Sequence, residues 1–304
     1  MPPPTNINVA VELYSKRFIP RLMRRLAPLH AFTMNFTDEF VESPGDTINV
    51  PLLEADTVAQ WNQASNNYRR VETDVATRPL KLTRRPIAGF AISQKHLHNF
   101  FPHWWEEKGN LNARAIAKDI LDDVYSHITP ENYGHTADTN IVWSPSTFTL
   151  KSVGELRTKV VERGMDGETA TLCLSPGYYS TLLTLLDASI KGSDSAIRRG
   201  ILDGVLGFMQ IVEVPGYNGP GFVCNQNALL VGSRRIMAAD LTPYKLFTSM
   251  VEPATGLHLN SVVYTDGATA VTSYSTEALF GYQTGEENSL IRMVTEMPTP
   301  PPAP

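Results

Sequence analysis

A long polar segment between two strand-like segments constrains the fold of this chain most strongly. The segment covers residues 54–78 and reads EADTVAQWNQASNNYRRVETDVATR. Apolar residues alternate with polar ones before and after it, at Ile48, Val50, Leu52, Leu80, Leu82, Phe90 and Ile92. Such alternation predicts half-buried strands. Because the polar segment has too little apolar surface to be buried on its own chain, we predict a long hairpin that projects from the body. Loops of this length are usually functional or disordered.

Residues 1–45 have the composition of an arm. Apolar residues recur there at helical spacing, interrupted by Pro20 and Pro28: Val11, Tyr14, Phe18, Leu22 and Leu26. Within it, residues 11–28 carry five cations and one acid, a net charge of +4 (5 − 1): Lys16, Arg17, Arg21, Arg24 and Arg25 against Glu12. Two interpretations remain open, an arm that lies on a neighbour or near a polyanion, and an ordinary N-terminal helix with a solvated basic face. We expect neither a signal peptide nor a membrane-spanning helix.

The strongest helix pattern covers residues 111–128, with one apolar face made of Ala113, Ile116, Ala117, Ile120, Leu121, Val124 and Ile128. We expect Asn110 or Asn112 to cap it. Residues 146–239 then alternate between helix and strand patterns, which predicts an α/β unit. Within it, Ser152 to Glu155 has the sequence of a capping box, and Gly164 is a natural helix terminator.

The end of the chain returns to strand patterns, from Leu257 to Glu296. Turn signals separate these strands at Asp266-Gly267 and at Thr284-Gly285. Residues 298–304 form a Pro-rich tail without the apolar residues that a core needs.

The sequence GVLGFMQIVEVPGY, residues 204–217, raises the question of a phosphate-binding loop. Its two glycines, Gly204 and Gly207, come before a strand-like run. A phosphate loop needs glycines that open a helix, so that free N–H groups face the anion. We therefore interpret Gly204 and Gly207 as a structural turn.

Other signals of chemistry are weak. His96, His98 and His103 are close in sequence. A helix would point the first two in nearly opposite directions, whereas on a strand they could share a metal, and the HExxH pattern is absent. Trp104 and Trp105 are compatible with base or sugar stacking, although such a pair more often packs the end of a domain. The GxSxG, Walker A and GxGxxG patterns do not occur. We expect no catalytic residue, no metal site and no cofactor.

Charge and cysteine content exclude further classes. The net charge of −5 argues against a dedicated nucleic-acid binder, though not against a protein that merely surrounds nucleic acid. Cys173 and Cys224 lie in apolar runs, so we expect small buried side chains that suit a reducing cytosol. A zinc site would need more ligands at closer spacing.

In their order, these segments resemble the major capsid proteins of tailed bacteriophages, whose fold encapsulin shells share. The segments that carry the resemblance are GDTINVPLL (45–53), RRPIAGFAISQKHLHNF (84–100), NLNARAIAKDILDDVYSHI (110–128), TATLCLSPGYYSTLLTL (169–185) and GVLGFMQIVEVPGYNGPGFVCNQNALLVGSRR (204–235). They are similar to the strands beside the family's hairpin loop, to its spine helix, and to the strands and helix of its axial domain. The closing strands, VVYTDGATA, ALFGYQ and NSLIRM, are similar to those that complete its peripheral domain.

The resemblance implies an α+β fold with five parts. These are an N-terminal arm (1–45), an extended β-hairpin loop (46–85), a peripheral domain with a long spine helix (86–145 and 240–297), an axial α/β domain (146–239) and the tail (298–304). It further implies a non-enzymatic protein that self-assembles into hexamers and pentamers of an icosahedral shell. Such a shell encloses double-stranded DNA without sequence-specific binding. The virion would be its location, after assembly in the host cytoplasm, with scaffolding, cement and portal proteins as further partners and no membrane.

The same resemblance suggests subunit-interface residues. We expect four hairpin residues, Trp61, Tyr68, Arg69 and Arg70, to lie on an adjacent subunit. We also expect Arg84 and Arg85 to meet the acids of that subunit, and Arg21, Arg24 and Arg25 of the arm to lie at an interface. Some relatives cross-link subunits through a lysine in the hairpin loop. Since this chain has no lysine between Glu54 and Pro79, we do not expect cross-linking.

Two alternatives remain open. One is an encapsulin-like nanocompartment that holds cargo enzymes. The other is a soluble α/β enzyme with its site near Gly204–Gly221 or at the histidine cluster.

Overall fold

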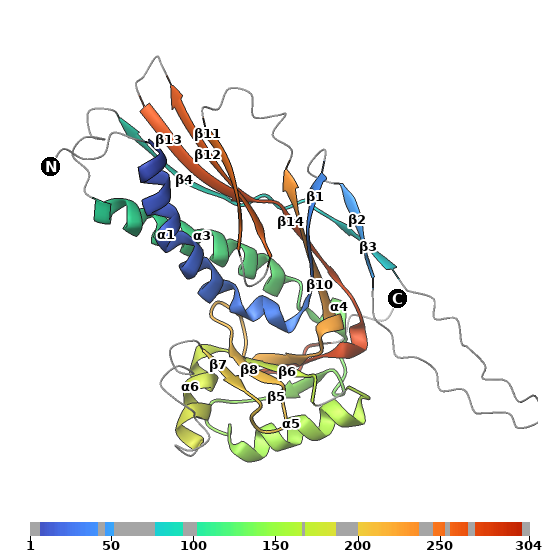
Figure 1. Cartoon of the computed structure of the whole chain (residues 1–304). Coiled ribbons are helices and arrows are strands. Elements are labelled where there is room, and N and C mark those ends of the chain that lie inside the picture. Colours follow the sequence, from blue (N-terminus) through green and yellow to red (C-terminus); the bar gives the residue numbers. More distant parts are fainter. Residues whose placement is uncertain are drawn as a thin grey trace, which may run out of the picture.

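The computed structural model describes residues 7–41, 46–51, 77–93, 102–165, 168–186, 200–236, 246–252, 256–266 and 271–299. Within these residues the chain is a mixed α+β protein, as the sequence predicts. One part places two long helices against a sheet of long strands, and a second part is a lobe around a six-stranded sheet (Figure 1).

In the first part, two helices cover one face of a four-stranded antiparallel sheet (Figure 1). The helices are α1 (Ile7–Leu26) and α3 (Pro102–Ser126). The strands, in sheet order, are β11 (Leu246–Val251), β12 (His258–Asp266), β13 (Val271–Ala278) and β4 (Ile87–Ser93). The Tyr14 hydroxyl lies 3.3 Å from the Thr276 hydroxyl, which joins α1 to the covered face of the sheet.

The apolar face of α1 belongs to the core of its own chain. Tyr14, Phe18, Leu22 and Leu26 are buried together with the apolar face of α3. An apolar stripe on each helix lets the two bury one another, which leaves the cations of α1 on its outer side. The arm expected over residues 1–45 is therefore corrected for residues 14–32. Of the two interpretations left open by the sequence, the structure agrees with the second, an ordinary helix with a basic outer face.

The helix expected over residues 111–128 begins earlier, at Pro102, and ends at Ser126. Gly109 favours a helix end in the sequence, yet it lies inside the helix against the backbone of Tyr14. Packing against α1 outweighs the low helix propensity of glycine at this position. Asn112 is not a cap, and its side-chain amide donates to the Tyr14 hydroxyl at 3.1 Å.

The second part is a lobe around a six-stranded sheet (Figure 1). Its strands, in sheet order, are β5 (Asn140–Val142), β15 (Leu290–Val294), β9 (Gly221–Cys224), β6 (Thr171–Leu174), β8 (Gln210–Glu213) and β7 (Ile201–Asp203). Leu172 and Leu174 face the core shared with α5 (Leu150–Glu162) and α6 (Pro176–Leu185). Cys173, between them, faces the core of α1 and α3. Both faces of this sheet are thus covered, which explains its nearly continuous apolar strands.

The boundaries of the expected axial unit, 146–239, differ at both ends. β5 precedes it and β15 follows it in sequence, yet both join its sheet. β10 (Leu229–Ile236) leaves it and pairs with β1 (Thr33–Val41) and β14 (Phe280–Thr284) in a separate three-stranded sheet. These pairings join strands far apart along the chain, so no local pattern reveals them. The remaining short elements are η1 (Ala27–Ala31), α4 (Pro130–Tyr133), η2 (Gln226–Ala228) and η4 (Glu287–Ser289).

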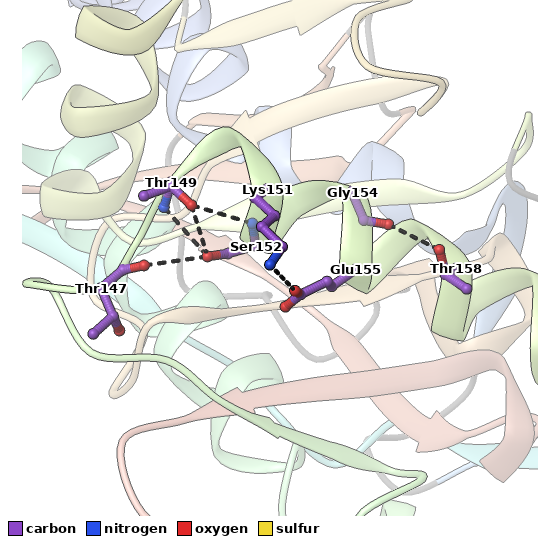
Figure 2. A network of polar contacts seen from close by, with 7 residues as sticks. All are labelled: Thr147, Thr149, Lys151, Ser152, Gly154, Glu155 and Thr158. Carbon is purple, nitrogen blue, oxygen red and sulfur yellow. Dashed lines mark hydrogen bonds and ion pairs between the residues drawn. The ribbon is translucent and has the colours of Figure 1, made fainter.

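The first turn of α5 is fixed by a capping box, which lies three residues earlier than the one predicted (Figure 2). The Ser152 amide donates to the Thr149 hydroxyl at 3.4 Å, and the Thr149 amide donates to the Ser152 hydroxyl at 3.3 Å. Ser152 is thus the third helical residue and Thr149 the cap. Glu155 instead lies 3.7 Å from the ammonium group of Lys151. The terminator predicted at Gly164 is confirmed, with φ +78°. Ser175 takes the N-cap position of α6, ahead of Pro176, and its side chain makes no capping hydrogen bond.

Candidate assembly surfaces

The strand patterns on either side of the polar segment form a two-stranded antiparallel ladder. β2 (Thr47–Pro51) and β3 (Thr77–Lys81) pair from Thr47↔Lys81 to Pro51↔Thr77. A small core of buried side chains fixes the ladder to the body: Val50, Leu80, Leu82, Leu230 and Leu279. The chain therefore holds the two ends of the polar segment in a defined place beside β10 and β14 (Figure 1).

Arg84 joins the segment after the ladder to α3. Its backbone exchanges hydrogen bonds with Phe280, and its guanidinium Nε lies 3.2 Å from the Asp123 carboxylate. Burial raises the pKa of Asp123, and the charge of Arg84 acts in the opposite direction. The acid that Arg84 meets thus belongs to its own chain. The expected position of Arg84 at a subunit interface stays a prediction.

Arg85 joins the same segment to β13. Its Nε and an Nη each donate to the Glu277 carboxylate at 3.0 Å, the fork geometry of a strong arginine–carboxylate pair. The Glu277 side chain is only 6% exposed, against 35% for Arg85, so the carboxylate depends on this partner. Two adjacent arginines therefore fasten the end of the ladder to different elements. For Arg85 too, a contact with another subunit stays a prediction.

We expect Arg85→Gln to lower the free energy of unfolding by about 3 kcal/mol, because it leaves a buried carboxylate without its cation. Arg84→Gln is the matched control, and its half-exposed pair should contribute less than about 1 kcal/mol. Urea unfolding followed by circular dichroism measures both. The double variant Arg85→Gln/Glu277→Gln should recover part of the lost stability, because it also removes the buried carboxylate. Equal losses in Arg85→Gln and Arg84→Gln would contradict the conclusion that Glu277 depends on Arg85.

The cations on the basic face of α1 fall into two groups with different surroundings. Arg17 lies 3.1 Å and Lys16 3.9 Å from the Glu106 carboxylate of α3. Arg21, Arg24 and Arg25, one to two turns further along, line a pocket where the end of α1 meets β8. Their expected contact with a neighbouring subunit stays a prediction.

Gly204 and Gly207 lie in the turn between β7 and β8, which pair antiparallel. Their φ angles are +61° and +78°, and Leu206 between them has φ +56°. The Gly204 amide donates to the Met209 carbonyl at 2.9 Å and closes the turn. Because a strand and not a helix follows, this turn lacks the helix terminus that would hold a phosphate.

We expect Gly207→Val to destabilise the chain by about 1 to 3 kcal/mol, because a β-branched residue at positive φ is strained. The added side chain also collides with the guanidinium of Arg157, which is exposed and can move. Thermal unfolding measures the loss. Adding Arg157→Ala to Gly207→Val removes the collision alone, so most of the loss should remain in the double variant. A complete recovery would show that backbone strain contributes nothing.

Several residues singled out in the sequence have other positions. Trp61, Tyr68, Arg69, Arg70, His96 and His98 lie outside the described residues. His103 is exposed at the start of α3. Trp105 is buried, with its ring centroid 4.8 Å from that of Tyr274 and 5.7 Å from that of Phe90. Trp105 therefore packs against other aromatic side chains of its own chain, and the interpretation as a ring that stacks on a base or sugar does not apply to it.

Cys173 and Cys224 are both buried and reduced, as expected. Among the residues that the structure describes, no group of three or more His, Cys, Asp or Glu side chains is placed to hold a metal ion. In the same part of the chain, no helix combines the length and the apolar character needed to span a membrane.

Sequence reasoning missed the partners of the singled-out arginines. Asp123 and Glu277 are the intrachain acids of Arg84 and Arg85. Glu213 and Arg114 are among the charges that act on Arg25. The sequence contains one weak signal for Glu277. It is an acid between Thr276 and Ala278, at the end of an alternating strand pattern, where a carboxylate needs a partner. The other contacts depend on how helices and strands cross, which the local sequence does not encode.

Comparisons with known proteins find similarity in solved structures only. No family model and no curated protein matches the sequence. The structure "Capsid structure of the Cyanophage P-SCSP1u" is similar over 87% of this chain and 86% of its own, with 10% identity and a TM-score of 0.49. The mature capsid of bacteriophage PhiM1 is similar over 88% and 86%, with 11% identity and a TM-score of 0.49. A virus-like particle from Pyrococcus furiosus is similar over 90% and 95%, with 10% identity and a TM-score of 0.47. These values concern the path of the backbone and assign no role to a residue of this chain.

Proposed function

We propose that this chain is the major capsid protein of a tailed bacteriophage. Copies assemble into hexamers and pentamers, which close into an icosahedral shell around a double-stranded DNA genome. The role is structural and not enzymatic, and the assembled protein belongs to the virion. Scaffolding, cement and portal proteins are further partners that we propose for such a shell.

The observation that carries this proposal is the base of the β2–β3 ladder. A buried core and the pairs of Arg84 and Arg85 fix the ladder to the body. Between its last residues, Pro51 and Thr77, the chain inserts residues 52–76, most of which are polar. A segment that a protein holds in place but cannot bury on itself is suited to contacts with another molecule.

A second copy of the chain is the partner that fits best. A ring needs contacts between two different surfaces of each subunit, so that each subunit reaches the next and the rotation closes. A ladder at one side of the body can supply one such surface, and the body of the neighbour supplies the other. Trp61, Tyr68, Arg69 and Arg70 are the hairpin residues that we propose for this contact.

The order of elements supports the same proposal. After α1 and β1 come the anchored ladder, then the long helix α3 beneath a sheet, then the lobe with α5 and α6, and finally the strands that return to both parts. This order follows the one expected from the capsid resemblance. The boundaries differ, because β15 completes the sheet of the lobe and α1 packs on its own chain.

Sedimentation velocity of the purified chain tests the proposal. We expect capsomer-sized rings or closed particles, and in material from infected cells we expect DNA that resists nuclease. Particles that hold protein cargo and no nucleic acid would favour the encapsulin-like alternative. A stable monomer with saturable binding of a small molecule near Gly204–Gly221 would favour the enzyme and contradict the proposal.

A further inference from the structure

Three arginines gather in one pocket at the end of α1. The pocket has a volume of about 270 Å³ and lies between this helix end and strand β8. Arg21, Arg24 and Arg25 line it on the side of α1, and Glu213 is the acid on the side of β8. The charges that line it therefore sum to +2 (3 − 1), in a chain whose net charge is −5.

The electrostatics of the pocket favour a bound anion. Burial lowers the pKa of Arg25, and the charges of Arg21, Arg114 and Arg24 lower it further, while Glu213 raises it. The Nε atom of Arg21 is buried, and no hydrogen-bond acceptor for it lies among the described residues. Cations that repel one another around the same space become more stable when a negative charge occupies it.

The neighbouring part of α1 shows the contrast. A second pocket of about 350 Å³ shares Arg21 and Arg24 with the first, and there Glu106 and Glu107 of α3 supply two acids. Glu106 already pairs with Arg17. The acids of α3 thus compensate positive charge in the earlier part of the basic face of α1. The pocket at the end of α1 keeps an excess of positive charge.

We infer that this pocket binds a phosphate group, supplied by a nucleic-acid backbone or by free phosphate. Guanidinium groups bind phosphate oxygens through two parallel N–H donors, and several arginines converging on one pocket are typical of phosphate recognition. A phosphate dianion, or two phosphodiesters of one strand, balances the charge of +2, whereas one carboxylate of a protein partner balances half of it. The inference stands on the pocket alone. If the proposed shell function also holds, a nucleic-acid ligand would place the end of α1 on the side of the enclosed DNA.

Binding measurements on three variants of the full chain test this inference. Calorimetry with inorganic phosphate in a phosphate-free buffer, and fluorescence anisotropy with a 15-nucleotide single-stranded DNA, supply the two ligands. We expect Arg21→Gln/Arg25→Gln to weaken binding at least about tenfold, because the ligand loses its hydrogen bonds to two charged groups. Glu213→Gln should instead tighten binding several-fold. Lys118→Gln/Lys151→Gln removes two cations that do not line the pocket and should leave the affinity unchanged.

Every outcome has a defined meaning. Arginine-dependent binding of the DNA, with or without binding of inorganic phosphate, supports a nucleic-acid backbone, and arginine-dependent binding of inorganic phosphate alone supports free phosphate. If a ten-residue glutamate peptide binds with the same arginine dependence and phosphate does not, the ligand is a protein carboxylate and the inference is overturned. Binding that ignores the arginines, or no binding, overturns it as well. If Arg21→Gln/Arg25→Gln does not fold, Glu213→Gln alone tests the inference. An affinity for phosphate that does not increase in Glu213→Gln would then contradict it. Particle formation is scored separately, so the failure of either proposal is recognised.

Discussion

Deleting residues 56–76 is expected to leave a folded chain that no longer assembles. The deletion keeps the buried base of the ladder, Val50 and Leu80 included, and both arginine pairs that follow it. Residues 52–55 then remain between Pro51 and Thr77, and a loop of this length can close an antiparallel hairpin. The body should therefore keep its stability, while the surface proposed for the neighbouring subunit is lost.

Size-exclusion chromatography with light scattering measures the assembly state, and the thermal midpoint by circular dichroism measures the fold. A chain in which residues 56–76 are replaced by glycine and serine at equal length is the matched control. It keeps the length but removes the side chains of Trp61, Tyr68, Arg69 and Arg70, and it should also fail to assemble. If the deletion unfolds the body, the assignment of the loop is wrong. If the deleted chain assembles like its parent, the proposed role of the hairpin is wrong.

Gly281→Val is expected to cause a large loss of stability at the base of the ladder, comparable to that of Arg85→Gln. Gly281 lies on β14 opposite Gly232 of β10, directly beneath β3. A β-carbon at this position would collide with the backbone carbonyl of Lys81, which cannot rotate away as a side chain can. The ladder would have to lift from the body and expose Leu80 and Leu82. We expect a loss of about 3 kcal/mol, the upper range for overpacking of a buried site, together with defective assembly.

Gly154→Ala is the control for this substitution. Gly154 is exposed on α5, and no atom lies within 4 Å of the position that an added β-carbon would take. Alanine should stabilise the helix there by about 0.5 to 1 kcal/mol. Urea unfolding of both variants gives the comparison. A Gly281→Val chain as stable as the parent would show that β3 does not press on β14 as described.

Local patterns in the sequence predict the elements that depend on local chemistry. Alternation predicts β2, β3 and β4, and helical spacing predicts the second half of α3. The turn at Gly204 and Gly207 follows from their spacing and from the strand after them. The start of α3 could not be predicted, because Gly109 favours a break and only its contact with α1 overrides that preference.

Long-range pairing was beyond the reach of the sequence. β15 joins β9 through pairs such as Ile291↔Val223, and no spacing rule connects residues so distant. The candidate surfaces show the same limit. The arginines at 21, 24 and 25 stand out as a basic run, but Glu213 faces them only because β8 meets the end of α1. Sequence thus indicates which charges are unusual, and the fold decides which of them meet.

Negative-stain electron microscopy of the purified, full-length chain tests the shell proposal most directly. The proposal predicts closed, roughly isometric particles, or rings of five and six subunits where closure needs a scaffolding partner. The same preparation of the 56–76 deletion should show neither. A field of folded monomers from the parent chain, across protein concentrations and with the deletion chain indistinguishable from it, would contradict a capsid protein.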